Sequence, residues 1–166
     1  KISKKSEIYV SSDSKNIQGI ASKAGVKVHK RPSAMARDET SMLETTLDFI
    51  KNNNISDDTN IILLQPTSPF RSLDYFLKLK EVFESAIHAS SGISLVRCTF
   101  FHPSKIGVIS DKNKFNLFNV DHEENIDNDK KKPYFVMSGS FYIVKVSKLI
   151  ANNSFVGDSP VGLEEP

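Results

Sequence analysis

Stretches with the pattern of β-strands alternate with amphipathic helical stretches along the first 97 residues. The expected strands lie at 7–11, 26–30, 60–64 and 92–97. The helices expected between them begin near Ile17, Ser41 and Ser72. Parallel strands need a crossover connection, which is usually a helix. This order therefore predicts an α/β fold with a doubly wound, mostly parallel sheet.

Two of these segments have sharp sequence signals. The run NIILL at 60–64 is short and apolar, which is typical of a parallel strand covered on both faces. Ser41 and Glu44 form a capping-box pattern, and Ser72 can cap the helix that follows it. The buried stripe of that helix is expected to be Phe76, Leu79, Phe83, Ala86 and Ile87.

The alternation stops after Cys98. Residues 99–138 hold short β-like pieces and the charged stretch DHEENIDNDKKK, with no helical pattern. We expect this segment to be a small β-rich extension within a single domain that covers 1–166. The sequence SGSFYIVK then returns to a strand, and VSKLIANN follows as a short helix.

Composition and residue spacing argue against several classes of function. The net charge of +2 is too small to favour binding to nucleic acid or to an anionic membrane. No apolar run is long enough to span a membrane, so no membrane partner is expected. A single cysteine, Cys98, gives neither a disulfide framework nor a zinc cluster. The four histidines are scattered without a metal-binding pair, and each is more readily a surface or core residue than a catalyst.

In an open α/β sheet, ligands bind outside the carboxyl ends of the strands. One loop expected there is QPTSPFR, in which two prolines hold an amide, two hydroxyls and a guanidinium in a rigid turn. These groups could recognise a polar ligand, with the guanidinium suited to carboxylate or phosphate. The same loop could equally be a plain strand-to-helix turn, and the residues alone leave both readings open.

A second such loop is RPSAMARDETS, residues 31–41. Arg31, Asp38, Thr40 and the helix N-terminus behind them could receive a phosphate or a ribose. The alternative is that Asp38 to Ser41 only cap the helix.

Taken together, four motifs resemble those of the acylneuraminate cytidylyltransferases. VSSDS resembles the Val-Ser-Thr-Asp stretch of that family, and RPSAMARD resembles its Arg-Pro-x-x-Leu-Ala-x-Asp. QPTSPFR resembles its Gln-Pro-Thr-Ser-Pro-Leu-Arg, and SGSFYI its Asn-Gly-x-x-Tyr-Ile. The resemblance runs along nearly the whole chain.

This resemblance implies a Rossmann-like fold of the nucleotide-sugar transferase type, whose β-rich extension, at about 99–138, makes a homodimer. It implies a cytoplasmic enzyme that joins CTP to a sialic-acid-like 2-keto sugar acid with the help of Mg²⁺. By position, the expected nucleotide-binding residues are Arg31, Asp38, Thr40 and Ser41. The expected sugar-binding residues are Gln65, Thr67, Ser68, Arg71 and Tyr142. No catalytic residue is assigned.

The chain also departs from the family pattern. The Arg-Gly-Gly-Ser-Lys-like loop that holds the triphosphate and the Asp-Ile-Asp motif that binds Mg²⁺ do not occur in it. We therefore expect the chain to be a fragment, the Mg²⁺ ligands to lie outside it, and residues 1–166 alone not to turn over CTP. Met42 replaces a frequent Ser, and Asn128 and Val136 stand at arginine positions, with Lys130 to Lys132 as possible substitutes. Legionaminic- or pseudaminic-type acids are thus candidate substrates.

Two other functions remain open. One is cytidylyl transfer to an eight-carbon keto acid such as 3-deoxy-manno-octulosonate, against which the Gln-Pro-Thr-Ser-Pro loop argues. The other is a catalytically inactive domain that binds a nucleotide or a sugar.

Overall fold

The computed structural model describes residues 6–99, 103, 106–110, 114–117 and 133–166. Its first unit is β1 (Tyr9–Ser12), α1 (Lys15–Lys23) and β2 (Lys27–Lys30), in which the two strands pair in parallel. Ser14 caps α1, and Gly25, with φ of +73°, ends the turn after it. Glycine adopts this left-handed conformation without strain, which makes it a common residue at helix ends.

A second sheet holds four strands in the order β3 (Asn60–Leu63), β7 (Phe135–Lys145), β4 (Ser91–Arg97) and β8 (Pro160–Glu164). β7 is antiparallel to both β3 and β4, and β8 is parallel to β4. Three of these four strands therefore run in one direction, and β7 opposes them. The α/β class and the mostly parallel, Rossmann-like arrangement are confirmed, although the reversal of β7 was not predicted.

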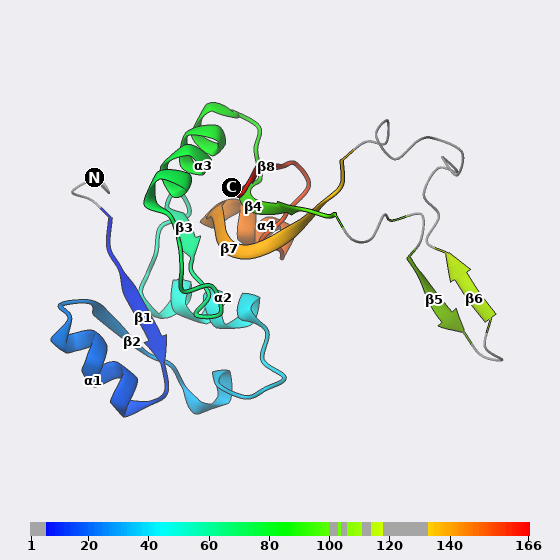
Figure 1. The fold of residues 1–166 in the computed structure, drawn as a ribbon. Helices are drawn as coiled ribbons and strands as arrows, with labels where there is room; N and C mark the ends of the chain where they lie inside the picture. Colours follow the sequence, from blue (N-terminus) through cyan, green and yellow to red (C-terminus); the bar gives the residue numbers. More distant parts are fainter. Residues whose placement is uncertain (1–5, 100–102, 104–105, 111–113, 118–132) are drawn as a thin grey trace.

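Helices cover both faces of this sheet (Figure 1). Side chains of α3 (Leu73–Ser85) pack on Phe141 and Ile143 of β7 and on β8. On the other face, α2 (Met42–Asn52) and α4 (Val146–Asn152) pack around Val144. Successive residues of β7 thus point to opposite faces, which makes β7 the centre of the core. A short 3₁₀ segment, η1 (Ser33–Met35), lies between β2 and α2.

Two expectations about burial are wrong. The NIILL run is not covered on both faces, because Ile62 is 37% and Leu64 50% exposed. β3 lies at the edge of the described sheet, and α3 packs over its neighbours rather than over β3. The stripe of α3 also ends earlier than predicted. The helix stops at Ser85, so Ile87 lies beyond it and is 91% exposed.

Part of the expected β-rich extension lies within the described residues. β5 (Gly107–Ser110) and β6 (Lys114–Leu117) form an antiparallel hairpin. Asn128 and Lys130 to Lys132 lie outside the described residues. The boundaries of the extension and its role in a dimer stay predictions.

Candidate functional site

The loop that follows β3 carries the sequence QPTSPFRS and leads into α3. It begins with a tight turn, in which the amide of Ser68 donates to the carbonyl of Gln65 over 3.3 Å. It ends at the N-cap of α3, where the Ser72 hydroxyl accepts from the Tyr75 amide at 3.3 Å. The prolines remove donors that could draw the loop into a sheet or a helix. The loop therefore contains both the turn and the helix cap. Whether it also binds a ligand depends on the side chains between them.

Arg71 fastens this loop to β7. Its Nε donates to the carbonyl of Ser140 at 2.8 Å, and its Nη2 donates to the carbonyl of Gln65. The guanidinium also lies over the Phe141 ring, 5.7 Å from the ring centroid. Burial lowers the pKa of Arg71, an effect that nearby Glu165 partly offsets. The side chain thus ties its own loop to β7, a strand far away in sequence.

β7 is distorted opposite this bridge. Its pairing with β4 shifts register between Ile93 and Leu95, which marks a β-bulge around Ser138–Ser140. The bulge is held by the fully buried Ser94, whose hydroxyl lies 2.6 Å from the Ser138 hydroxyl and accepts from the Phe141 amide at 2.9 Å. Bulges of this kind redirect side chains beside functional sites.

Gly139 sits in the bulge with φ of +80°, directly beside the Gln65 side chain. A Cβ at this position would stand 3.1 Å from Gln65 Oε1. The glycine therefore lets the strand pass under the Gln65 amide, and the two motifs QPTSPFR and SGSFYI meet at this point.

Gly139→Ala is expected to destabilise the protein by about 1–2 kcal/mol, because an L-residue pays that much in the left-handed region. The matched control is Gly19→Ala in α1, where a Cβ meets nothing within 4 Å. That change is expected to be neutral or to stabilise by about 0.5–1 kcal/mol, since Gly is unfavourable inside a helix. Urea unfolding of both variants in the full-length protein measures the contrast. Equal effects at the two positions would contradict the strained conformation.

The remaining sugar-site candidates lie near this junction. Thr67 is exposed and Ser68 is half-buried. Tyr142 lies two residues beyond Ser140 on β7, pairs with Leu63 of β3, and packs its ring 5.8 Å from that of Phe155. Gln65 and Arg71 thus lie in the loop that follows β3, and Tyr142 lies on β7, the strand that pairs with β3. The roles of these residues stay predictions.

A small pocket of about 140 Å³ opens on the α3 side of the junction. It is lined by Phe70, Arg71, Ser72, Tyr75, Ser140, Phe141, Glu165 and Pro166. Within it the Tyr75 hydroxyl donates to the carbonyl of Leu163 at 2.5 Å. Burial, and then the charge of Glu165, raise the pKa of Tyr75 to about 12.

This pKa predicts a loss of stability at high pH. In the unfolded chain Tyr75 ionises near its ordinary value of about 10, whereas the folded protein keeps it neutral to about pH 12. The contribution of neutral Tyr75 to the free energy of unfolding is thus complete below about pH 10 and is lost as the pH rises to about 12. Tyr75→Phe is expected to cost about 1 kcal/mol at pH 8. Its deficit relative to wild type should shrink in unfolding experiments at higher pH; a constant deficit would contradict the shift.

The nucleotide-site candidates follow β2. Ser41 caps α2 in a complete capping box, because its hydroxyl accepts from the Glu44 amide at 3.1 Å and its amide donates to the Glu44 carboxylate at 2.7 Å. The hydroxyl of Thr40 donates to the carbonyl of Ala34 at 3.3 Å, and Asp38 is exposed. Of these residues, Ser41 is thus the one whose side chain caps the helix, and the carboxylate of Asp38 remains open to solvent.

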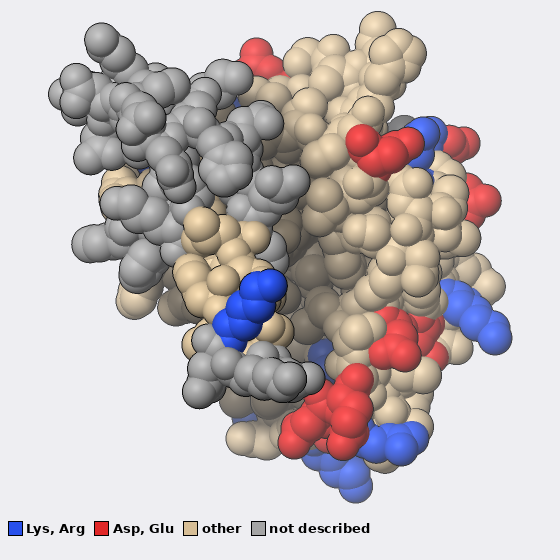
Figure 2. Space-filling model, turned by 90° about the vertical axis from the view of Figure 1, so that its right-hand side faces the viewer, with Lys and Arg blue, Asp and Glu red and all other residues tan. Residues whose placement is uncertain are grey.

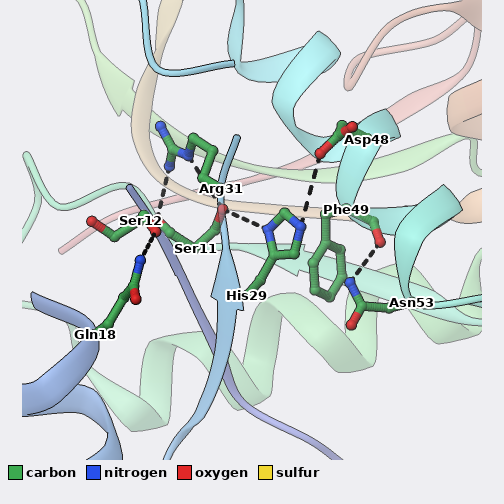
Figure 3. Close-up of polar contacts among 8 residues, drawn as sticks. All are labelled: Ser11, Ser12, Gln18, His29, Arg31, Asp48, Phe49 and Asn53. Atoms are coloured by element: carbon green, nitrogen blue, oxygen red, sulfur yellow. Dashed lines mark hydrogen bonds and ion pairs between the residues drawn. The ribbon is translucent and has the colours of Figure 1, made fainter. Parts of the chain in front are cut away.

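Arg31 belongs to a cluster that the sequence did not reveal (Figure 3). Its guanidinium contacts Ser11 on β1, which in turn contacts His29 on β2, and His29 faces Asp48 on α2. His29 had been assigned to the surface or the core, and it is 6% exposed. The one available signal was local: His29 lies on β2 and Arg31 follows two residues later, directly after the strand ends, so the extended spacing favours side chains on the same side.

The described residues contain no group of three or more His, Cys, Asp or Glu side chains that could hold a metal ion. By themselves these residues do not fit a Mg²⁺ site. On the face shown in Figure 2, acidic and basic side chains are interspersed and form no patch of a single sign. Within the same part of the chain, no helix has the length and apolarity to cross a membrane.

Comparison with known proteins places these motifs in one family. Residues 1–149 match a family model described as cytidylyltransferase. The chain is 28% identical over 158 residues to the CMP-N,N'-diacetyllegionaminic acid synthase of Legionella pneumophila, covering 92% of this chain and 65% of that protein. It is 23% identical over 151 residues to the N-acylneuraminate cytidylyltransferase of Streptococcus agalactiae serotype III, covering 91% of this chain and 35% of that protein. The family match covers most of the chain and includes RPSAMARD, QPTSPFR and SGSFYI, so the chain belongs to the cytidylyltransferase family.

Proposed function

We propose that the protein carrying this chain transfers CMP from CTP to a sialic-acid-like 2-keto sugar acid and releases pyrophosphate. The observation that carries the proposal is the junction of QPTSPFR with SGSFYI. There Arg71 ties the loop to Ser140, and the Gln65 amide rests against Gly139. The two relatives, a CMP-N,N'-diacetyllegionaminic acid synthase and an N-acylneuraminate cytidylyltransferase, support the same reaction class.

The proposed roles follow from side-chain chemistry. Gln65 offers one acceptor and two donors from a held position, which suits the hydroxyl and acyl groups of a sugar. Thr67, Ser68 and Tyr142 would line the same pocket, and Arg71 would keep its shape. Across the carboxyl ends of the strands, the nucleotide would meet Arg31, Asp38, Thr40 and Ser41, with the α2 N-terminus favouring phosphate.

The reaction forms one bond and breaks one. The anomeric hydroxyl oxygen of the sugar acid attacks the α-phosphorus of CTP in line, and the oxygen that bridges the α- and β-phosphorus leaves with pyrophosphate. The proton of that hydroxyl is released to solvent, so each transfer yields one CMP-sugar, one pyrophosphate and one proton. Catalysis of such a transfer depends on position and on charge stabilisation. A divalent cation, proposed here as Mg²⁺, would offset phosphate charge.

Two further parts of the proposal are the assembly and the location. A homodimer built on the β-rich extension, and a cytoplasmic location, would follow the family pattern. Sedimentation of the full-length protein tests the dimer independently of activity.

The function is tested by incubating the full-length protein with CTP and a panel of 2-keto sugar acids while pyrophosphate release is measured. Release with a sialic-, legionaminic- or pseudaminic-type acid supports the proposal. Release only with 3-deoxy-manno-octulosonate, or binding of CTP without release under any condition, would overturn it in favour of one of the other two functions.

A further inference from the structure

Side chains of β1, β2 and α2 form a polar chain that ends at Arg31, the residue directly after β2 (Figure 3). His29 Nδ1 lies 2.9 Å from the Ser11 hydroxyl, and His29 Nε2 lies 3.8 Å from Asp48 Oδ2. Arg31 Nε donates to the same Ser11 hydroxyl at 3.3 Å, and its Nη2 donates to the Ser11 carbonyl at 2.8 Å. Ser11 therefore stands between the imidazole and the guanidinium.

The direction of each contact follows from the chemistry of the groups. Asp48 Oδ2 is buried and accepts no hydrogen bond from the described residues, so it favours a proton on the nitrogen that faces it. That tautomer of His29 carries its proton on Nε2 and leaves Nδ1 as an acceptor. The Ser11 hydroxyl must then donate to Nδ1, which leaves its oxygen lone pairs for the N–H of Arg31.

The opposite tautomer, with the proton on Nδ1, does not fit these contacts. It would set the lone pair of Nε2 against the buried carboxylate, and two acceptors would face each other. Burial lowers the pKa of His29, the charge of Arg31 lowers it further, and Asp48 opposes both, so the ring is neutral at neutral pH. The Phe49 ring, 5.3 Å away and nearly perpendicular, packs against the imidazole and restricts its rotation.

We propose that His29 and Ser11 are positioning residues that hold the Arg31 guanidinium in the orientation that receives the phosphates of CTP. This inference rests on the proposed function, which gives Arg31 to the nucleotide. Two N–H groups of Arg31 donate to Ser11, and within the described part of the chain no hydrogen bond engages the others, which would bind the ligand. A long arginine side chain otherwise loses much rotamer freedom when it binds, and ordering it beforehand improves affinity.

The test uses three single variants of the full-length protein. Ser11→Ala removes the hydroxyl that lies between the His29 imidazole and the Arg31 guanidinium. His29→Asn keeps an amide near the Nδ1 position, where it can still accept from Ser11, whereas His29→Gln keeps one near the Nε2 position and loses that contact. Ser85→Ala, an exposed serine at the end of α3, is the matched control.

Ser11→Ala and His29→Gln are expected to raise the KM and the Kd for CTP about 5- to 20-fold, because each variant loses about one hydrogen bond of the chain that holds Arg31. The KM for the sugar acid should change less than about 2-fold, and His29→Asn should recover most of the CTP affinity. A purely structural role would instead lower both affinities and the melting temperature together, with His29→Asn and His29→Gln alike. That result would overturn the proposal.

A double-mutant cycle with Arg31→Ala gives the sharper answer. If Ser11 acts through Arg31, then Ser11→Ala adds less than about 2-fold to the CTP Kd once Arg31 is gone. If the fold-changes in the CTP Kd for the two single variants multiply in the double variant, Ser11 acts independently of Arg31. That result would overturn the inference. Because the cycle is measured by calorimetric titration of CTP, it remains decisive even if the full-length protein binds CTP but fails to release pyrophosphate.

Discussion

Arg71→Ala is expected to lower the free energy of unfolding by about 2–4 kcal/mol, because it removes two charge-assisted hydrogen bonds to carbonyls, of which only that of Gln65 keeps a second donor, the Ser68 amide. Those carbonyls belong to Gln65 and Ser140, so the loss falls on the junction between the loop and β7. The contact with the Phe141 ring is lost as well. Guanidinium-induced unfolding of the full-length protein measures the change.

The matched control for this prediction is Arg97→Ala. Arg97 forms an exposed pair with Glu164 at 2.9 Å, and solvent-exposed pairs contribute little. Arg71→Lys should fall between wild type and Arg71→Ala, since a single ammonium lacks the planar fork that spans both carbonyls. If Arg71→Ala were no worse than Arg97→Ala, then Arg71 would not hold the loop.

Gln65→Ala is expected to raise the KM for the sugar acid about 10- to 100-fold, while the KM for CTP changes less than about 2-fold. The reason is that the sugar acid loses its hydrogen-bonding partner when the side-chain amide of Gln65 is removed, and its polar groups are left unpaired in the site. Steady-state kinetics with each substrate varied in turn provides the measurement. The fold should survive, because the backbone carbonyl of Gln65 still accepts from Arg71.

Asn53→Ala serves as the amide control for Gln65→Ala. The Asn53 amide donates to the carbonyl of Phe49 at 2.9 Å at the end of α2, so its loss costs some stability without touching the loop. Neither KM should change more than about 2-fold. Equal rises in both KM values for Gln65→Ala would contradict the proposal that this side chain binds the sugar acid.

Local features were predictable from the sequence because nearby residues determine them. The capping box of Ser41 and Glu44 spans three positions, and the cap at Ser72 is equally local. The end of α3 was not predicted, because Ile87 continues the apolar spacing although the helix stops at Ser85. Periodicity shows which residues could share a face, and it does not show where the helix ends.

Features that depend on distant pairing could not be predicted from the residues alone. The antiparallel course of β7 and its bulge arise from pairing with β3 and β4, far away in sequence. The cluster around His29 needs β1, β2 and α2 together, so no single stretch carries its signal. The meeting of QPTSPFR with SGSFYI was expected only through the family resemblance, and the structure places these motifs side by side.

The central claim is tested most directly by identifying the product. The full-length protein, CTP and one sialic-, legionaminic- or pseudaminic-type acid at a time are incubated, and the mixture is analysed by mass spectrometry alongside pyrophosphate release. We expect a CMP-sugar to form in equal amount to pyrophosphate with at least one of these acids. Bound CTP with no CMP-sugar from any of them would contradict it.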